Sequence, residues 1–233
     1  LEALKETNPL QRILFLKGKQ TDEVSEILRL CRALDIPAQA VPKERLDRVT
    51  RKNHQGVVAF TSPIEFQPLD EVVLGAFERG ETPLIVALDG VTDVRNLGAI
   101  ARTAECFGAT GLLVPMTGSA PINEDAVKSS AGALLRLPMC RARRMDETIR
   151  MVGNLGLSAV AVCEQGGQPL ATLDSSAPTC LILGDEHSGI SPEVLKHCVK
   201  TVSIPMQGKT ASLNVGVAAG IVLFASQQKL SPH

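Results

Sequence analysis

Residues 83–115 read PLIVALDGVTDVRNLGAIARTAECFGATGLLVP: an apolar run, a helical pattern and a second apolar run. The two apolar runs, LIVALDG and GLLVP, are short enough to be strands, and residues 96–107 between them have the spacing of a helix. Strands that alternate with helices form a mainly parallel sheet covered on both faces. This stretch therefore predicts an α/β fold.

The same alternation continues to the end of the chain. It predicts a helix near residues 124–130, strands at LSAVAV and TCLILGD, a helix from residue 192, a strand at TVSIP and a final helix. We expect residues 83–233 to form one domain. Ligands of such sheets bind at the carboxyl ends of the strands, where three loops are unusually polar: DGVTDVRNLGAIARTA, GDEHSG and PMQGKTASLN. None contains G-x-G-x-x-G, which disfavours the ordinary dinucleotide-binding fold.

Residues 1–62 have the pattern of a separate small α/β domain. A strand RILFLKG, an amphipathic helix, a short helix near KERLDRVT and a strand GVVAF follow one another. The apolar face of the amphipathic helix is formed by Val24, Ile27, Leu28, Cys31 and Leu34. Residues 61–83 then contain three prolines and one short helical pattern, so we interpret residues 63–82 as a linker.

Basic side chains cluster late in the first domain. The cluster consists of Arg45, Arg48, Arg51, Lys52 and His54. It is either a solvated face or a surface that meets RNA. The net charge of −1 gives the whole chain no general attraction to nucleic acid, so a surface that binds RNA has to be local.

The composition limits the class of protein. With 233 residues and 44% hydrophobic residues, the chain can bury a substantial core. It has no Trp or Tyr, so contacts to RNA have to depend on Arg, backbone groups and small polar residues more than on stacking. The six cysteines form no C-x-x-C pair, which favours reduced thiols over disulfides or zinc. No apolar run approaches about 18 residues and no signal peptide is visible, so we expect a cytoplasmic protein without a membrane span.

The stretch GKTASLNVGVAAGIVLF, residues 208–224, opens a nearly apolar helix with polar residues. A P-loop is excluded because position 203 is Ser where the motif needs Gly, and Pro205 stiffens the loop. Ser212 has the character of a cap, but Asn214 lies beyond the expected cap and needs a partner from elsewhere in the fold. Asp185 and His187 flank Glu186, yet two ligands without a third are weak grounds for a metal, and we predict none.

The three polar segments resemble, in order and spacing, the three motifs of the SpoU (TrmH-like) family of RNA 2′-O-ribose methyltransferases. The matching segments are DGVTDVRNLGAIARTAECFGA, LILGDEHSGIS and IPMQGKTASLNVGVAAGI. Two further segments, VPMTGSAPINEDAVKSSAGAL and HQGVVA, resemble the subgroup with an L30e-like RNA-binding domain, which methylates a guanosine of large-subunit ribosomal RNA. The resemblance implies a SPOUT fold with a C-terminal trefoil knot, one of the rare exceptions to unknotted topology.

The resemblance also implies S-adenosylmethionine as cofactor, RNA as substrate and a homodimer. It implies catalytic roles for Asn96, Arg102, Glu186, Ser212 and Asn214, and places Gly184, Ile204, Met206 and Leu213 against the cofactor. Since a guanidinium normally stays protonated, we interpret Arg102 as binding a phosphate and stabilising alkoxide charge, which leaves the proton acceptor open, with Glu186 as a candidate. We expect Gly184 to let the backbone approach the ligand, and Gly216, where the family often has serine, to affect packing.

Two alternatives to a ribosomal RNA methyltransferase remain at this stage. The substrate could be transfer RNA, since the extra domain favours ribosomal RNA but does not name the nucleotide. A non-catalytic RNA-binding assembly factor could also keep the fold. The presence of all five expected active-site residues disfavours that last alternative.

Overall fold

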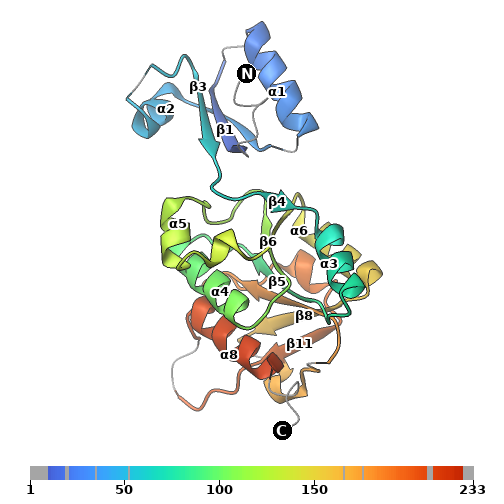
Figure 1. Ribbon diagram of the computed structural model, residues 1–233. Helices are drawn as coiled ribbons and strands as arrows, with labels where there is room; N and C mark the ends of the chain where they lie inside the picture. The colour runs from blue at the N-terminus through green and yellow to red at the C-terminus, as the bar shows by residue number, and fades with distance from the viewer. Residues whose placement is uncertain are drawn as a thin grey trace. The chain divides into compact units, whose positions relative to one another are not determined.

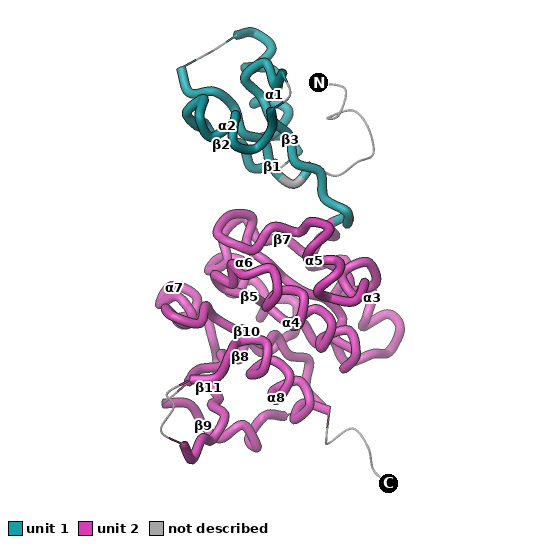
Figure 2. The backbone as a smooth tube through the Cα atoms, turned by 90° about the vertical axis from the view of Figure 1, so that its left-hand side faces the viewer, with its two compact units in different colours: residues 1–65 teal, residues 66–233 magenta. Residues whose placement is uncertain are grey.

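The computed structural model (Figure 1) describes residues 10–18, 21–34, 36–51, 53–164, 166–174, 176–208 and 212–227. The chain divides into two compact units, residues 1–65 and 66–233, coloured separately in Figure 2. Each unit has its own core, and each is described by itself.

Unit 1 is a three-stranded sheet with two helices. Its central strand β1 (Leu10–Leu16) pairs in parallel with β2 (Ala38–Val41) and antiparallel with β3 (Val57–Thr61). Helix α1 (Asp22–Ala33) buries Cys31 against one side of β1, and α2 (Lys43–Val49) buries Leu46 in a second apolar cluster. The expected small α/β domain is confirmed.

The segment predicted as a linker, residues 63–82, belongs largely to unit 2. Strand β4 (Phe66–Gln67) pairs in parallel with β7, and helix α3 (Leu69–Glu78) buries Val72 and Val73 in the core of unit 2. The linker prediction is therefore wrong from residue 66 onward. The prolines were misleading because proline is tolerated on edge strands and just before a helix, and Pro68 caps α3.

Unit 2 is built on an eight-stranded sheet in the order β4-β7-β6-β5-β10-β8-β11-β9. All of its strand pairs are parallel, which confirms the predicted fold class. The remaining strands are β5 (Leu84–Asp89), β6 (Gly111–Pro115), β7 (Met139–Ala142), β8 (Ser158–Cys163), β9 (Gln168–Pro169), β10 (Thr179–Gly184) and β11 (Lys200–Ser203).

Helices cover both faces of this sheet (Figure 1). Helix α3, with α6 (Met145–Val152) and α7 (Pro192–Leu195), packs on a core that contains Cys140 and Ala142 of β7. The opposite face carries α4 (Val94–Cys106), α5 (Glu124–Ser129) and α8 (Val215–Gln227). Short 3₁₀ helices lie at Ala133–Leu135, Gly153–Leu155 and Leu170–Thr172.

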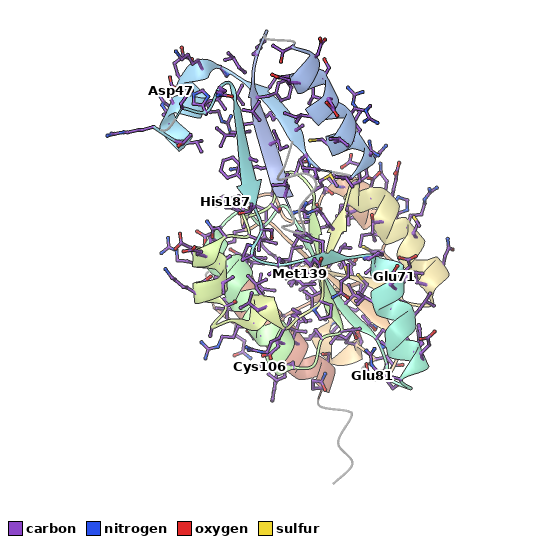
Figure 3. The ribbon with its side chains drawn as sticks, turned by 45° about the horizontal axis from the view of Figure 1, so that its top comes forward. Asp47, Glu71, Glu81, Cys106, Met139 and His187 are labelled. Atoms are coloured by element: carbon purple, nitrogen blue, oxygen red, sulfur yellow. The ribbon has the colours of Figure 1, made fainter. Side chains whose placement is uncertain are left out.

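The cysteines behave mainly as buried apolar residues. All six are free, as the sequence predicts, and Cys31, Cys140 and Cys180 are buried. Burial raises the pKa of the Cys140 thiol to about 12, which keeps it protonated and unreactive near neutral pH. Cys106 differs, because it lies exposed on α4 (Figure 3). Within the described residues, no helix has the length and apolar character needed to cross a membrane.

Candidate active site

The sheet brings two of the three polar loops to one place. Strands β5 and β10 are neighbours, and their last residues, Asp89 and Gly184, are paired across the ladder. The loop that leads to α4 and the loop that contains Glu186 therefore begin side by side. The loop that leads to α8 completes the site, because Asn214 at its end bonds to both of the others.

Helix α4 begins two residues earlier than the sequence suggests. Asp93 is its N-cap, and its Oδ1 accepts hydrogen bonds from the backbone N–H groups of Arg95 at 2.7 Å and Asn96 at 3.1 Å. Asn96 lies in the first turn and is not the cap, so its side chain is available for contacts with other elements. It donates from Nδ2 to Glu186 Oε1 at 3.1 Å.

Asn214 has a double role at the start of α8. The helix begins at Val215, so the expectation that Asn214 lies beyond the cap is wrong: its Oδ1 accepts from Gly216 N at 3.0 Å and Val217 N at 3.3 Å, as an N-cap does. The expectation of a distant partner is confirmed, because Nδ2 donates to Asn96 Oδ1 at 2.9 Å and to Glu186 Oε1. The oxygen of this amide holds its own helix, and the nitrogen binds the other two loops.

Glu186 joins the starts of the two helices. Its Oε1 accepts from both asparagine amides and from Val215 N at 3.3 Å. Its Oε2 accepts no hydrogen bond within the described residues, so one carboxylate oxygen is fixed and the other can accept a proton from a ligand. Asn96, Glu186 and Asn214, which we call the amide–carboxylate cluster, form the fixed part of the site.

A tight turn positions Glu186. Asp185 Oδ1 accepts from His187 N at 2.9 Å and from Ser188 N and Oγ at 3.1 Å, and these bonds hold the pKa of Asp185 below its usual value. Backbone bonds between Asp185 and Gly189 close the turn. A Cβ at Gly184 would lie 2.1 Å from the carbonyl carbon of Gly189, so the turn itself requires glycine there, beyond any need of a ligand.

A cavity of about 330 Å³ lies beside the cluster. All four residues expected at the cofactor line it: Gly184, Ile204, Met206 and Leu213. Ser212 lines the same cavity. The lining also includes Cys163 and Glu164 at the end of β8, which sequence reasoning missed. Their signal was the end of a parallel strand, but only the strand order shows that β8 lies next to β10.

Arg102 is not part of the cluster. It lies six residues after Asn96 on α4, about 9 Å further along the axis and turned by about 240° around it. Its side chain is exposed and has no hydrogen bond or ion pair within the described part of the chain. The structure thus brings together Asn96, Glu186, Asn214 and the cavity, and leaves Arg102 apart from them.

Helices α4 and α8 run in the same direction and pack closely through small residues. A Cβ at Gly216 would lie 3.4 Å from Ala99 Cβ and 3.1 Å from Asn214 Oδ1, and one at Gly220 would lie 3.8 Å from Thr103 Cγ2. Further along, the rings of Phe107 and Phe224 meet edge to face. Gly216 therefore affects packing, as expected, and a larger residue there would press on the amide oxygen of the cap.

The basic cluster of unit 1 divides in two. Arg45, Arg48 and Arg51 are exposed on or just after α2, and Lys52 lies outside the described residues. His54 differs: its side chain is only 12% exposed, Nδ1 accepts from Gly56 N at 3.0 Å and Nε2 lies 2.9 Å from Asp47. Because Nδ1 accepts, the proton resides on Nε2. The geometry of His54 is that of a turn-forming residue that is mostly buried, so the exposed part of the predicted basic surface is formed by the arginines.

Asp185 and His187 show no metal-site geometry. The carboxylate of Asp185 is engaged in its own turn, and no group of three or more potential ligands occurs among the described residues.

The site as a whole defines the class of protein. Polar groups at the carboxyl edge of a parallel sheet, beside a cavity of this size, are those of a ligand-binding α/β protein.

The particular family follows from comparison with known proteins. The chain belongs to the SpoU rRNA methylase family, whose model matches residues 83–224. The model for RNA 2′-O ribose methyltransferase substrate binding matches residues 1–67.

Relatives and solved structures agree with this family. An uncharacterized tRNA/rRNA methyltransferase of Mycobacterium sp. (strain KMS) is 36% identical over 225 residues, covering 96% of this chain and 72% of the relative. The SpoU methyltransferase AviRb of Streptomyces viridochromogenes, solved with AdoMet, is similar with a TM-score of 0.65, 28% identity and coverage of 99% and 87%. An AdoMet-bound rRNA methyltransferase of Sinorhizobium meliloti has a TM-score of 0.65 at 27% identity, covering 99% of this chain and 84% of that one.

Proposed function

We propose that this protein transfers the methyl group of S-adenosylmethionine to a ribose 2′-hydroxyl of RNA, with a guanosine of large-subunit ribosomal RNA as the target. The observation that carries the proposal is the cavity that opens directly beside the amide–carboxylate cluster. This arrangement offers space for a donor molecule next to groups that can orient an acceptor. The membership of the chain in a family of RNA methyltransferases supports the same reaction.

The cavity fits the cofactor in size and in lining. Its volume of about 330 Å³ lies at the lower end of the usual range for small-molecule sites. Ile204, Met206 and Leu213 offer apolar surface to a base, while Glu164 offers a carboxylate that can accept hydrogen bonds from ribose hydroxyls. The cofactor supplies an electrophilic methyl group when bound.

The residues of the chain orient the acceptor and take up its proton. Ser212 lines the cavity next to Asn214 in sequence, so its hydroxyl can hydrogen-bond the ribose. The free Oε2 of Glu186 is the acceptor best placed to receive the hydroxyl proton, because Oε1 is already held by three donors. Arg102 lies apart from the cluster of its own chain, so its proposed roles, binding the substrate phosphate and stabilising the developing alkoxide, depend on how the bound RNA and the second copy are placed.

Unit 1 supports an RNA substrate. Arg45, Arg48 and Arg51 are exposed there, and the substrate-binding family matches the same unit. Such a second RNA-binding surface favours ribosomal RNA over transfer RNA. The assembly-factor alternative is disfavoured because the cluster is fully assembled and Glu186 Oε2 accepts no hydrogen bond from the described residues.

The proposed active form is a homodimer with the C-terminal knot of its superfamily, working in the cytoplasm. On α8, Val217 and Phe224 are each 51% exposed and Ile221 is 37% exposed, although Val215, Ala219 and Val222 of the same helix are buried. An apolar face of this kind favours association with a second copy. Arg102 and Cys106 of α4 are exposed as well, on the helix that packs against α8.

The test is binding followed by transfer. Calorimetric titration with S-adenosylmethionine in the presence of EDTA should show one site per chain, and labelled methyl groups should pass to unmethylated ribosomal RNA transcribed in vitro. Nucleoside mass spectrometry should then find 2′-O-methylguanosine. Methylation of a base would contradict the ribose 2′-hydroxyl as acceptor, and abolition of activity by EDTA would contradict a reaction without metal. Transfer only to tRNA would contradict ribosomal RNA as the substrate.

A further inference from the structure

Arg141 is placed unusually for an arginine of unit 2. It lies near the end of β7, with its guanidinium carbon 3.6 Å from the centre of the Phe66 ring. Phe66 is the first residue of β4, the strand next to β7. The Arg141 side chain is only partly exposed, and it makes no hydrogen bond or ion pair within the part of the chain that the structure describes.

A partly buried arginine normally has an acidic partner. Even Arg136 and Arg144 of the same unit, which are exposed, have such partners, with contacts of 2.7 Å to Glu105 and 3.0 Å to Asp146. Among the described residues Arg141 has no such partner, and its burial lowers the pKa of the guanidinium to about 10, at which it is still a cation at neutral pH. The ring of Phe66 covers one face of the guanidinium plane and leaves the N–H groups at its edge available.

Arg141 shares its edge of the sheet with the candidate active site. Cys140, Leu113, Ala87 and Ile182 form one row across β7, β6, β5 and β10. Arg141 is one residue beyond this row, and Gly184, which leads to Glu186, is two residues beyond it. Three strand spacings separate β7 from β10, a distance of about 14 Å.

Arg141 also shares a face of the sheet with the cluster. Its neighbours Cys140 and Ala142 point into the core beneath α3 and α6, so Arg141 points to the opposite face, which carries α4 and α8. Met139, two residues earlier and on the same face as Arg141, is buried in the interior of unit 2 (Figure 3). The buried side chains on this face of β7 thus end at Arg141, which has no acidic partner among the described residues, on the face of the sheet that carries α4 and α8.

We infer that Arg141, held flat by Phe66, binds a backbone phosphate of the RNA substrate close to the nucleotide that is methylated. A phosphate matches the flat fork of N–H donors at the guanidinium edge and supplies the negative charge that the site lacks. Arg141 is then a positioning residue: it fixes the RNA along the carboxyl edge of the sheet and touches no reacting atom. The inference rests on the proposed function, because the RNA path is defined by the target ribose.

The test uses the full chain and unmethylated large-subunit ribosomal RNA transcribed in vitro. Arg141→Gln keeps a planar side-chain end and removes the charge. We expect about tenfold weaker RNA binding, in line with the loss of a charged hydrogen-bonded contact. We also expect the salt dependence of log K to become less steep by about 0.7, the effect of one phosphate contact on a single strand. Affinity for S-adenosylmethionine and the melting temperature should stay as in the parent.

Arg150→Gln is the matched control, since Arg150 is exposed on α6 on the other face of the sheet. It should leave RNA affinity and salt dependence unchanged. Phe66→Leu keeps apolar cover and the charge of Arg141 but removes the aromatic plane, so it should weaken RNA binding about threefold with the salt slope unchanged.

Three results would overturn the inference: parental RNA affinity and slope in Arg141→Gln, an equal loss in Arg150→Gln, or a loss of cofactor affinity that matches the loss of RNA affinity. If Arg141→Gln fails to fold, unchanged affinity in Phe66→Leu overturns it instead. Failure of the proposed function is a separate observation, because the parental protein would then bind RNA without methylating a ribose.

Discussion

Helices α4 and α8 are organised differently at their two ends. At their starts, Asn96 and Asn214 bond to each other and to Glu186, so this end is complete within one chain. Further along the same helices, Arg102 has no partner among the described residues, and Val217, Ile221 and Phe224 are exposed. The first region is preorganised by the fold. We propose that the second region meets RNA and a second copy of the chain, and each of the following predictions tests this difference.

The largest effect is expected at Arg102. Arg102→Ala should slow the chemical step by on the order of a hundredfold or more, as loss of one donor to a developing oxyanion does. Arg102→Lys should not restore the parental rate, because an ammonium lacks the planar two-donor fork. Single-turnover rates at saturating RNA measure the step. A parental rate, or a loss explained by weaker cofactor binding, would assign the chemistry to Glu186 alone.

The second largest effect is expected on dimer formation, from a substitution on the apolar face of α8. Ile221→Glu puts a charge into the proposed contact between two copies, and each copy loses an apolar side chain worth about 1.5–3 kcal/mol. The dissociation constant of the dimer should rise by about a hundredfold, measured by sedimentation or light scattering across a dilution series. Met151→Glu is the matched control, because Met151 is an apolar side chain that is 55% exposed on α6, on the other face of the sheet. If the parent protein is a fully active monomer at working concentration, the proposed contact between two copies through α8 is wrong.

The preorganised end should be less sensitive to loss of one member. Glu186→Ala removes the acceptor shared by two amides and Val215 N, so we expect destabilisation by about 1 kcal/mol in urea unfolding and a rate about tenfold lower. The loss stays near tenfold because water can accept the hydroxyl proton in place of Glu186 Oε2. Unchanged stability in this variant would show that the cluster is not held by the carboxylate.

The smallest effect is expected at the turn that carries Glu186. Asp185→Ala should destabilise the protein by about 1 kcal/mol at pH 7, comparable to the loss of a helix cap. The hydrogen bonds hold the folded-state pKa of Asp185 below its unfolded value, so the contribution is present above about pH 4 and is lost as pH falls through the folded pKa. Unfolding curves of parent and variant should therefore converge in acid. A difference that persists at low pH would exclude the carboxylate as its source.

Local patterns were sufficient for the architecture. The alternation of apolar runs and helical spacing from residue 83 predicts the parallel sheet, because burial on both faces demands nearly continuous apolar strands. The sequence pattern gives the wrong prediction where proline is the main signal. It predicts a linker at β4 and α3, because an edge strand and a helix start tolerate proline just as a linker does. Which strands are neighbours was also beyond the pattern, so Glu164 was missed.

For the site, local sequence was enough to point to two asparagines, a glutamate and a serine in the loops after strands and at the starts of helices, and to an arginine further along α4. Their contacts with one another follow only from the folded chain, because hydrogen bonds between segments 90 and 118 residues apart depend on strand order and helix packing. It made Asn214 both a cap and a bridge, engaged His54 in a turn, and left Arg102 and Arg141 without acidic partners in the described chain. The charge of a side chain and its spacing from its neighbours can be read from the local sequence, whereas its ion-pair or hydrogen-bond partner depends on the whole fold.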